Sequence, residues 1–236
     1  MKKEYKQIKW TPENVTRFWD FTSQFHELYF TYQFGDLIVD KLKKYFGSAH
    51  TVLDYGCGTG DIIPHLLRLG VDVTGIDFSP ESVELVNNKF NNEPHFRGAF
   101  CLDEVLKKNE KFDAIMLVEV IEHLDDEYLD RTFEDIKKLI AKDGILIVTT
   151  PNDEKLKDSE VFCPQCEHSF HRWQHVRSWN VNTLPDYLKK KGFNVVESFT
   201  TDFSASFKRN KLNHLKYLVK RMANMRLPHL VCVCKI

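Results

Sequence analysis

The stretch VLDYGCGTGD, residues 52–61, decides the fold, because a β-rich run passes through closely spaced glycines into a helical segment. Gly56, Gly58 and Gly60 lack Cβ atoms, so the backbone turns sharply there and approaches a ligand closely. Their G-x-G-x-G spacing differs from the G-x-G-x-x-G spacing that binds the pyrophosphate of nicotinamide dinucleotides. The spacing therefore disfavours a dehydrogenase, and a plain strand–helix turn with a capping acid is the alternative to a ligand-binding loop.

Acidic side chains surround this turn. Asp54 precedes the glycines and Asp61 follows them; two carboxylates repel a pyrophosphate and suit a ligand with a cationic amino-acid end. Asp77 ends the next β-rich run, about twenty residues on, where a carboxylate hydrogen-bonds a ribose diol. Phe78 beside it offers an aromatic face to an adenine ring. We therefore predict a nucleoside ligand that carries an amino-acid end.

Outward from the turn, strand-like and helical runs alternate. The β-rich runs are residues 51–56, 71–77, 112–120, 145–151, 193–199 and 229–236. Such alternation is typical of parallel βαβ units in a doubly wound α/β sheet. We predict a single domain over residues 1–236, made of a helical cap (1–46), a cofactor-binding core (48–150), a Cys/His-rich lid (151–180) and a substrate-side half (181–236).

Composition limits the class of protein. The 236 residues are 42% hydrophobic and 28% charged, enough for one full core. No window approaches about eighteen uninterrupted apolar residues, and no apolar run follows the N-terminal lysines, so neither a transmembrane span nor a signal peptide is expected. We expect a cytoplasmic location, where six cysteines indicate free thiols or metal ligands. The net charge of −1 gives no general attraction to nucleic acid.

These motifs resemble one family, the class I S-adenosylmethionine-dependent methyltransferases, over roughly residues 48–200. LDYGCGTG (53–60) looks like its glycine motif, and GIDFSPE (75–81) looks like its ribose-binding acid motif. FDAIMLVEVIEHL (112–124) and LIAKDGILIVTTPN (139–152) look like its fourth-strand motif and the helix–turn–strand that follows. The resemblance implies a Rossmann-like, seven-stranded sheet whose final strand is antiparallel.

The resemblance also implies methyl transfer from S-adenosylmethionine. It places Asp54 and the three glycines near the methionine part of this cofactor and Asp77 on its ribose. The family often has an acid near the adenine, after the third strand. This chain has Ala99 and Phe100 there, so Phe100 is the candidate adenine contact.

The string EVIEHL, residues 119–124, supplies the candidate catalytic residues. Glu119, Glu122 and His123 fall at i, i+3 and i+4, one face of a helix, at the carboxyl edge of the sheet where ligands bind. Such a trio suits Mg²⁺ or Mn²⁺. The alternatives are that His123 acts as a base or orients the substrate, or that it serves only in packing.

EVIEHL also resembles two metal-dependent branches of the family, the O-methyltransferases of ubiquinone biosynthesis and the small-RNA 2′-O-methyltransferases. In the RNA branch, a histidine downstream of the fifth strand is a fourth metal ligand. HVRSWN (175–180) matches that pattern, so the resemblance makes His175 the candidate.

CPQCEHSFHRWQH, residues 163–175, contains a second ligand pattern. Cys163, Cys166, His171 and His175 have the spacing of soft ligands that converge on Zn²⁺, with His168 as an alternative to His171. The other interpretation is free thiols beside histidines that line the substrate pocket. We predict a zinc-stapled lid, and zinc bound to His175 would leave the EVIEHL trio without its fourth side chain.

The C-terminal region is basic, with no acid after Asp202. Its basic residues are Lys208, Arg209, Lys211, Lys216, Lys220, Arg221, Arg226 and Lys235. A helix over about residues 207–224 would place Leu212, Leu215, Val219 and Met222 on one stripe. This pattern indicates an amphipathic helix with a solvated basic face, and peripheral membrane contact or an anion grip are the alternatives.

The activity expected from these features is O-methylation of a small molecule or of a glycan or lipid precursor. Two alternatives stay open. One is a metal-dependent RNA 2′-O-methyltransferase, which the net charge disfavours. The other is a non-catalytic cofactor-binding module whose zinc loop docks a partner.

Overall fold

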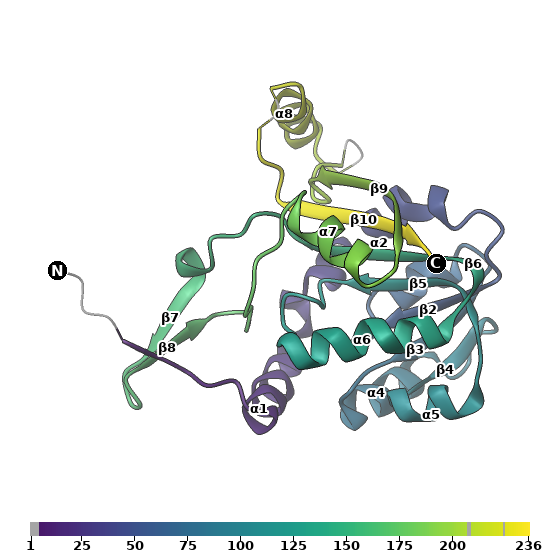
Figure 1. Cartoon of the computed structure of the whole chain (residues 1–236), viewed down its shortest axis with the longest axis horizontal. Coiled ribbons are helices and arrows are strands. Elements are labelled where there is room, and N and C mark those ends of the chain that lie inside the picture. The colour runs from purple at the N-terminus through teal and green to yellow at the C-terminus, as the bar shows by residue number, and fades with distance from the viewer. Residues whose placement is uncertain (1–4, 207–208, 224) are drawn as a thin grey trace.

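The computed structural model describes residues 5–206, 209–223 and 225–236. Its centre is a seven-stranded sheet with the order β4-β3-β2-β5-β6-β10-β9 (Figure 1). Strands β2 to β6 pair in parallel, whereas β10 is antiparallel to both β6 and β9. The bounds are β2 (Thr51–Tyr55), β3 (Asp72–Ile76), β4 (Phe96–Phe100), β5 (Phe112–Val118), β6 (Ile140–Pro151), β9 (Asn194–Thr201) and β10 (His229–Lys235). The predicted Rossmann-like sheet with an antiparallel final strand is confirmed.

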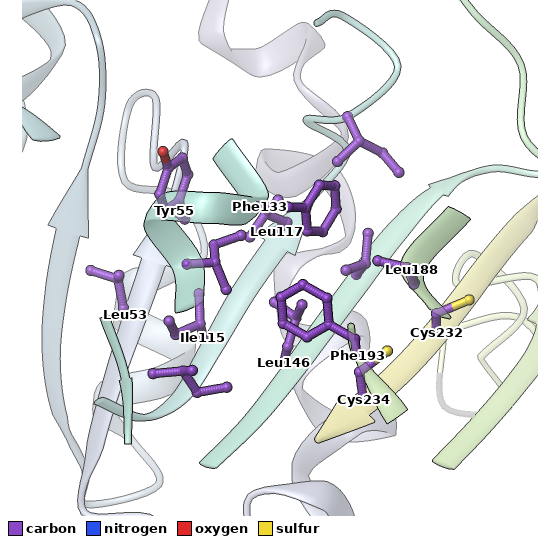
Figure 2. Packing of buried hydrophobic residues seen from close by; sticks show 14 of the residues in the cluster. Leu53, Tyr55, Ile115, Leu117, Phe133, Leu146, Leu188, Phe193, Cys232 and Cys234 are labelled. Carbon is purple, nitrogen blue, oxygen red and sulfur yellow. The ribbon is translucent and has the colours of Figure 1, made fainter. Parts of the chain in front are cut away.

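Helices cover both faces of this sheet. One face packs against α2 (Phe30–Leu42), α3 (Ile63–Leu67) and α4 (Pro80–Phe90). The other face packs against α5 (Leu102–Lys108), α6 (Asp126–Leu139) and α7 (Thr183–Lys190). Because side chains alternate along a strand, β5 sends Ile115 and Leu117 to the α6 face and Met116 to the other. Figure 2 shows the α6 side of this core, with Phe133 among the strand residues.

The helical cap predicted within residues 1–46 is interrupted. It consists of α1 (Pro12–Thr22), a 3₁₀ segment (Ser23–Leu28), α2, and a short 3₁₀ turn (Lys43–Tyr45). Thr11 caps α1 by accepting a hydrogen bond from the Asn14 N–H at 3.3 Å. The helical conformation fails at Phe25, whose φ and ψ are −120° and 49°, and Tyr29 is extended. This break directs Tyr29 towards the glycine loop, which a continuous helix would not do.

The lid region forms a hairpin that projects from the main sheet (Figure 1). Strands β7 (Glu160–Cys163) and β8 (His168–His171) pair antiparallel after a 3₁₀ turn, Leu156–Ser159. The N-terminal strand β1 (Lys6–Gln7) pairs in parallel with β8 and completes a three-stranded sheet. Sequence analysis did not predict β1, because two residues carry no periodicity and their partner lies far along the chain.

The C-terminal basic helix is α8 (Lys211–Met222), and Lys208 lies outside the described residues. Its predicted apolar stripe is exposed, with Met222 at 86% of its full accessibility, and Tyr217 is its buried side chain. None of the helices in the described parts of the chain is both long and apolar enough to cross a membrane.

Candidate active site

The glycine loop joins β2 to α3 and has the backbone that only glycine adopts easily. Gly56 and Gly60 have φ values of +82° and +73°, and Gly58 has +51°. A Cβ on Gly56 would stand 2.7 Å from Val120 Cγ2, so the loop touches the segment that contains Glu119 and Glu122. The cofactor loop and the candidate catalytic string are therefore in direct contact.

Asp54 lies on β2 just before the loop and is 3% exposed. Its Oδ2 atom is buried and has no hydrogen-bond partner in the described residues. Burial, and then the charges of Asp77 and Asp61, raise the pKa of Asp54 to about 7. Asp61 differs, because Thr59 and Lys89 both bond its carboxylate. Of these two carboxylates, that of Asp54 therefore remains available to bind a cationic group.

Asp77 follows β3 and braces the loop. It accepts a 2.8 Å hydrogen bond from the Gly58 N–H and a 3.0 Å bond from the Ser79 N–H. Burial raises the pKa of Asp77, and these bonds oppose that shift. Phe78 beside it is 60% exposed, so its ring is accessible to a base. Phe100 ends β4, and Lys108 Nζ lies 3.4 Å from its ring centroid.

Tyr29 lies beside the glycine loop. Its ring carbon Cε2 would lie 3.9 Å from a Cβ built on Gly58. Burial, followed by the negative charges of Asp77 and Asp61, raises the pKa of the Tyr29 phenol above its usual range, so its hydroxyl stays protonated. The structure therefore brings Asp54, the glycines and Asp77 together as predicted and adds an aromatic wall.

The predicted acids follow β5 and are held by the neighbouring strand β6. The Thr149 hydroxyl donates to Glu119 Oε1 at 2.8 Å, and the Thr150 hydroxyl donates to Glu122 Oε2 at 2.9 Å. Glu119 has a φ of +54°, an uncommon conformation for a residue other than glycine and one found at functional sites. Burial raises the pKa of both carboxyls, and the charge of Glu119 raises that of Glu122 further.

His123 and His175 lie close to the carboxylate of Glu122. Ligand atoms of Glu122, His123 and His175 lie within 4.8 Å of one another. Glu122 Oε1 and His123 Nδ1 are buried without a hydrogen-bond partner in the described segments. Burial, followed by the charge of His175, lowers the pKa of His123 to about 3, so its imidazole is neutral. Glu119 stands beside this group rather than within it.

The predicted zinc ligands are not assembled as one site. In the hairpin register, Cys163 faces His168, and His171 faces Glu160 at the opposite end. Cys163 and Cys166 lie at the hairpin turn, and Cys166 is exposed, whereas His171 and His175 contact Glu154 at the buried base. The physical reason is that an extended β-hairpin separates pairs that a compact loop would bring together. His168, the alternative to His171, lies opposite Cys163 at the turn, and its Nδ1 contacts the Cys166 carbonyl oxygen at 2.6 Å. Among the described residues, neither cysteine belongs to a group of three possible metal ligands.

Two residues at this site, Glu154 and Gln174, were not predicted from the sequence. Glu154 has one carboxylate oxygen 2.5 Å from His175 Nδ1 and the other 3.3 Å from His171 Nε2. Gln174 donates from its side-chain amide to the His123 carbonyl oxygen at 3.0 Å. Both residues lie in segments whose sequence is typical of polar loops. Their spacing from the other site residues does not indicate a functional role.

Known proteins share parts of this sequence. Residues 26–198 match a family described as a methyltransferase domain. A ubiquinone biosynthesis O-methyltransferase from Pelagibacter ubique is 36% identical over 104 residues, which cover 43% of this chain and 42% of that protein. The mitochondrial ubiquinone biosynthesis O-methyltransferase of Homo sapiens is 28% identical over 187 residues, which cover 72% of this chain and 50% of that protein. The chain thus spans about half the length of these curated relatives or less.

A solved structure shares the fold. The glycopeptide N-methyltransferase MtfA complexed with sinefungin has a TM-score of 0.63 and 13% identity, and the match covers 86% of this chain and 94% of that chain. At that identity, the likeness shows the fold alone. Because the family match extends over more than half of the sequence, the chain belongs to the methyltransferase-domain family, which confirms the predicted resemblance to class I S-adenosylmethionine-dependent methyltransferases.

Proposed function

We propose that this protein transfers the methyl group of S-adenosylmethionine to a hydroxyl oxygen of a small-molecule acceptor. The observation that carries the proposal is the contact between the cofactor loop and the acidic string, through Gly56 and Val120. The contact joins the loop that follows Asp54, whose Oδ2 is buried without a partner among the described residues, to the segment between Glu119 and Glu122. The resemblance to ubiquinone biosynthesis O-methyltransferases supports oxygen as the methylated atom.

The cofactor site fits the nucleoside that the family uses. Asp54 Oδ2 lacks a partner among the described residues and suits the ammonium group of the methionine end. Asp77 lies where it would accept hydrogen bonds from the ribose hydroxyls, and the exposed ring of Phe78 offers a surface to the adenine. Bound S-adenosylmethionine supplies a methyl group already activated on a sulfonium sulfur. The protein therefore has to align the acceptor and remove its proton.

The acidic site fits a divalent cation. Glu122 Oε1 and His123 Nδ1 are buried and unpaired among the described residues, and His175 brings a third ligand within 4.8 Å. A carboxylate with two imidazoles suits Mn²⁺ or a related ion. A cation held there would lower the pKa of an acceptor hydroxyl beside it. Glu122, His123 and His175 would hold the ion, in place of the Glu119–Glu122–His123 set expected from spacing alone.

Glu119 is the residue we assign as the base. Burial raises the pKa of its carboxyl above the usual range, so its ionised form is a stronger base than an ordinary glutamate. Thr149 fixes one carboxylate oxygen at 2.8 Å. As the acceptor oxygen bonds to the methyl carbon, its proton passes to Glu119. The carbon–sulfur bond breaks, its electron pair stays on sulfur, and S-adenosylhomocysteine is released.

The exposed apolar stripe on α8 is relevant to the chemical class of the methyl acceptor. Leu212, Leu215, Val219 and Met222 are all more than half exposed, and the basic residues around them are not balanced by any acid after Asp202. An apolar stripe with basic flanks suits peripheral contact with an anionic membrane surface. This feature supports a lipid precursor over a glycan precursor as the acceptor.

The direct test is methyl transfer in vitro. The protein, S-adenosylmethionine and Mn²⁺ are incubated with a panel of phenols, catechols and hydroxylated lipid precursors, and products are identified by mass spectrometry. We expect an O-methylated product in at least one acceptor class, and loss of that product in Glu122→Gln. Leu85→Ala, an exposed change on α4, is the control that should behave like the unchanged protein. Methylation of short RNA alone, at moderate salt, would replace the proposal with the RNA alternative.

A further inference from the structure

A second group of ionisable side chains shares His175 with the site proposed above. Glu154, His171 and His175 also place ligand atoms within 4.8 Å of one another. Glu154 follows β6, His171 ends β8, and His175 lies on the segment that returns from the hairpin. The mechanism above uses neither Glu154 nor His171, although both are largely withdrawn from solvent, with side chains 19% and 4% exposed.

The backbone fixes the tautomer of His171. Its Nδ1 atom accepts hydrogen bonds from the N–H groups of Trp173, at 3.3 Å, and of His175, at 3.2 Å. A neutral imidazole that accepts at one nitrogen carries its hydrogen on the other, so Nε2 is protonated. That N–H lies 3.3 Å from Glu154 Oε1. A nitrogen that carries hydrogen has no lone pair for a metal ion, so in this tautomer His171 is not a ligand of the site that Glu122, His123 and His175 form.

Glu154 imposes the complementary arrangement on His175. Its other oxygen, Oε2, lies 2.5 Å from His175 Nδ1, and a carboxylate accepts hydrogen there rather than donating it. Nδ1 of His175 therefore carries the hydrogen, and Nε2 keeps its lone pair. The rings of His171 and His175 stack with centroids 4.3 Å apart and an interplanar angle of 17°, which limits rotation of His175.

We propose that Glu154 is a positioning residue. Together with the ring of His171, which stacks on His175, it holds His175 so that the Nε2 lone pair of His175 faces Glu122 and His123. Metal-binding histidines commonly donate their second ring N–H to a carboxylate, which orients the ring and strengthens the ligand. His175 Nε2 is the nitrogen that remains to face Glu122 and His123. The ring centroids of His123 and His175 are 4.8 Å apart. This inference rests on the proposed cation site, but its tautomer claim does not depend on a bound ion.

The test uses Glu154→Gln in the full chain, because glutamine keeps the shape but offers one acceptor and one donor to two N–H groups. Mn²⁺ affinity, measured by loss of the free-ion electron paramagnetic resonance signal, should fall about 10- to 100-fold. Affinity for S-adenosylhomocysteine should not change, which shows that the variant folds. Glu160→Gln is the matched control, since Glu160 is exposed on the same hairpin, and it should bind Mn²⁺ like the unchanged protein.

A second readout needs no metal. In long-range ¹H–¹⁵N spectra of the unchanged protein, we expect His175 to carry hydrogen on Nδ1 and His171 on Nε2, and Glu154→Gln to alter the His175 pattern. Where the unchanged protein binds Mn²⁺, equal affinity in Glu154→Gln would overturn the inference, and so would hydrogen on Nε2 of His175. If the unchanged protein binds no Mn²⁺ yet shows the expected tautomers, the cation site of the proposed function fails and only the orientation of the His175 ring by Glu154 stands.

Discussion

The indole N–H of Trp19 donates a 3.1 Å hydrogen bond to Gln174 Oε1, which ties helix α1 to the segment after the hairpin. The amide of Gln174 in turn donates to the His123 carbonyl oxygen at 3.0 Å. The Trp19 ring meets the His123 ring edge-on, with centroids 4.9 Å apart. Gln174 is 1% exposed and has a φ of +61°. Through this one side chain, the N-terminal helix reaches the main chain of the active site.

Removing the Gln174 amide should therefore weaken the fold. Gln174→Ala leaves the buried His123 carbonyl and the Trp19 N–H without this partner, and an unsatisfied buried polar group costs about 1–3 kcal/mol. We expect the free energy of unfolding in urea to fall by about that amount. Trp19→Phe is the comparison, because it removes the N–H but keeps an aromatic ring, and its loss should be smaller. If Gln174→Ala and the unchanged protein are equally stable, the two hydrogen bonds of Gln174 contribute nothing to the free energy of unfolding.

Cofactor affinity should depend on pH through Asp54. Because burial raises the pKa of Asp54 to about 7, the carboxyl is mostly neutral at pH 6 and ionised at pH 8. The ammonium group of S-adenosylhomocysteine binds the ionised form, so we expect affinity to weaken about tenfold for each pH unit below 7. Calorimetric titration between pH 5 and 8 measures this slope. In Asp54→Asn, binding should be weak and independent of pH, and a flat profile in the unchanged protein would contradict the assignment.

Asp54 also affects stability in the protein without cofactor. The folded state holds its proton more tightly than the unfolded chain, whose carboxyl has a pKa near the ordinary 3.8. Folded protein is thus favoured by this group at low pH, and the contribution is lost as the pH rises from 3.8 through 7. Subtracting the Asp54→Asn profile of unfolding free energy against pH should isolate this fall. A contribution that grew with pH would reverse the sign and place the carboxylate in an ion pair.

The two glutamates should fail in different ways. Glu119→Gln removes the proposed base, so methyl transfer should slow about 10²- to 10⁴-fold while Mn²⁺ affinity changes little. Glu122→Gln removes a proposed ligand, so Mn²⁺ affinity should fall and excess Mn²⁺ should restore part of the rate. Single-turnover rates and Mn²⁺ titrations measured on both variants separate the roles. Identical behaviour of the two variants would mean that both carboxylates act as one unit.

The cysteine pair at the hairpin turn should be dispensable for the site. Cys163 and Cys166 lie at the turn, whereas the histidines of the predicted zinc set contact Glu154 at the base. We expect the double variant Cys163→Ser, Cys166→Ser to keep the thermal unfolding midpoint and the Mn²⁺ affinity of the unchanged protein. Elemental analysis of both proteins completes the test. Loss of a stoichiometric zinc ion together with a lower midpoint would restore the zinc-stapled lid.

Helix α8 should bind anionic vesicles. Its stripe of exposed apolar residues would enter the lipid interface, and its lysines and arginines would meet the negative headgroups. Leu215→Ser with Val219→Ser should reduce binding to phosphatidylglycerol vesicles in a sedimentation assay, whereas the unchanged protein should bind less as salt increases. Neutral phosphatidylcholine vesicles are the control, and equal binding to both compositions would remove the electrostatic part of the proposal.

Much of the cofactor half was readable from sequence because its information is local. The alternation of β-rich and helical runs indicated the sheet, and three glycines at fixed spacing indicated a loop with positive φ. Asp54 and Asp77 follow from the same logic, since the carboxyl ends of parallel strands meet at one edge. The break at Phe25 was not readable, because it depends on where Tyr29 packs rather than on helix propensity.

The acidic half shows the opposite case. The sequence by itself identified Glu119, Glu122 and His123 as candidates, and the family resemblance added His175. It nevertheless favoured a zinc site made of Cys163, Cys166, His171 and His175. Spacing along the chain does not say whether a segment is a compact loop or an extended hairpin, and only the pairing of β7 with β8 decided this. Tertiary contacts then made Glu154 the neighbour of both histidines, because the antiparallel hairpin returns the chain after β8 to the segment that leads into β7.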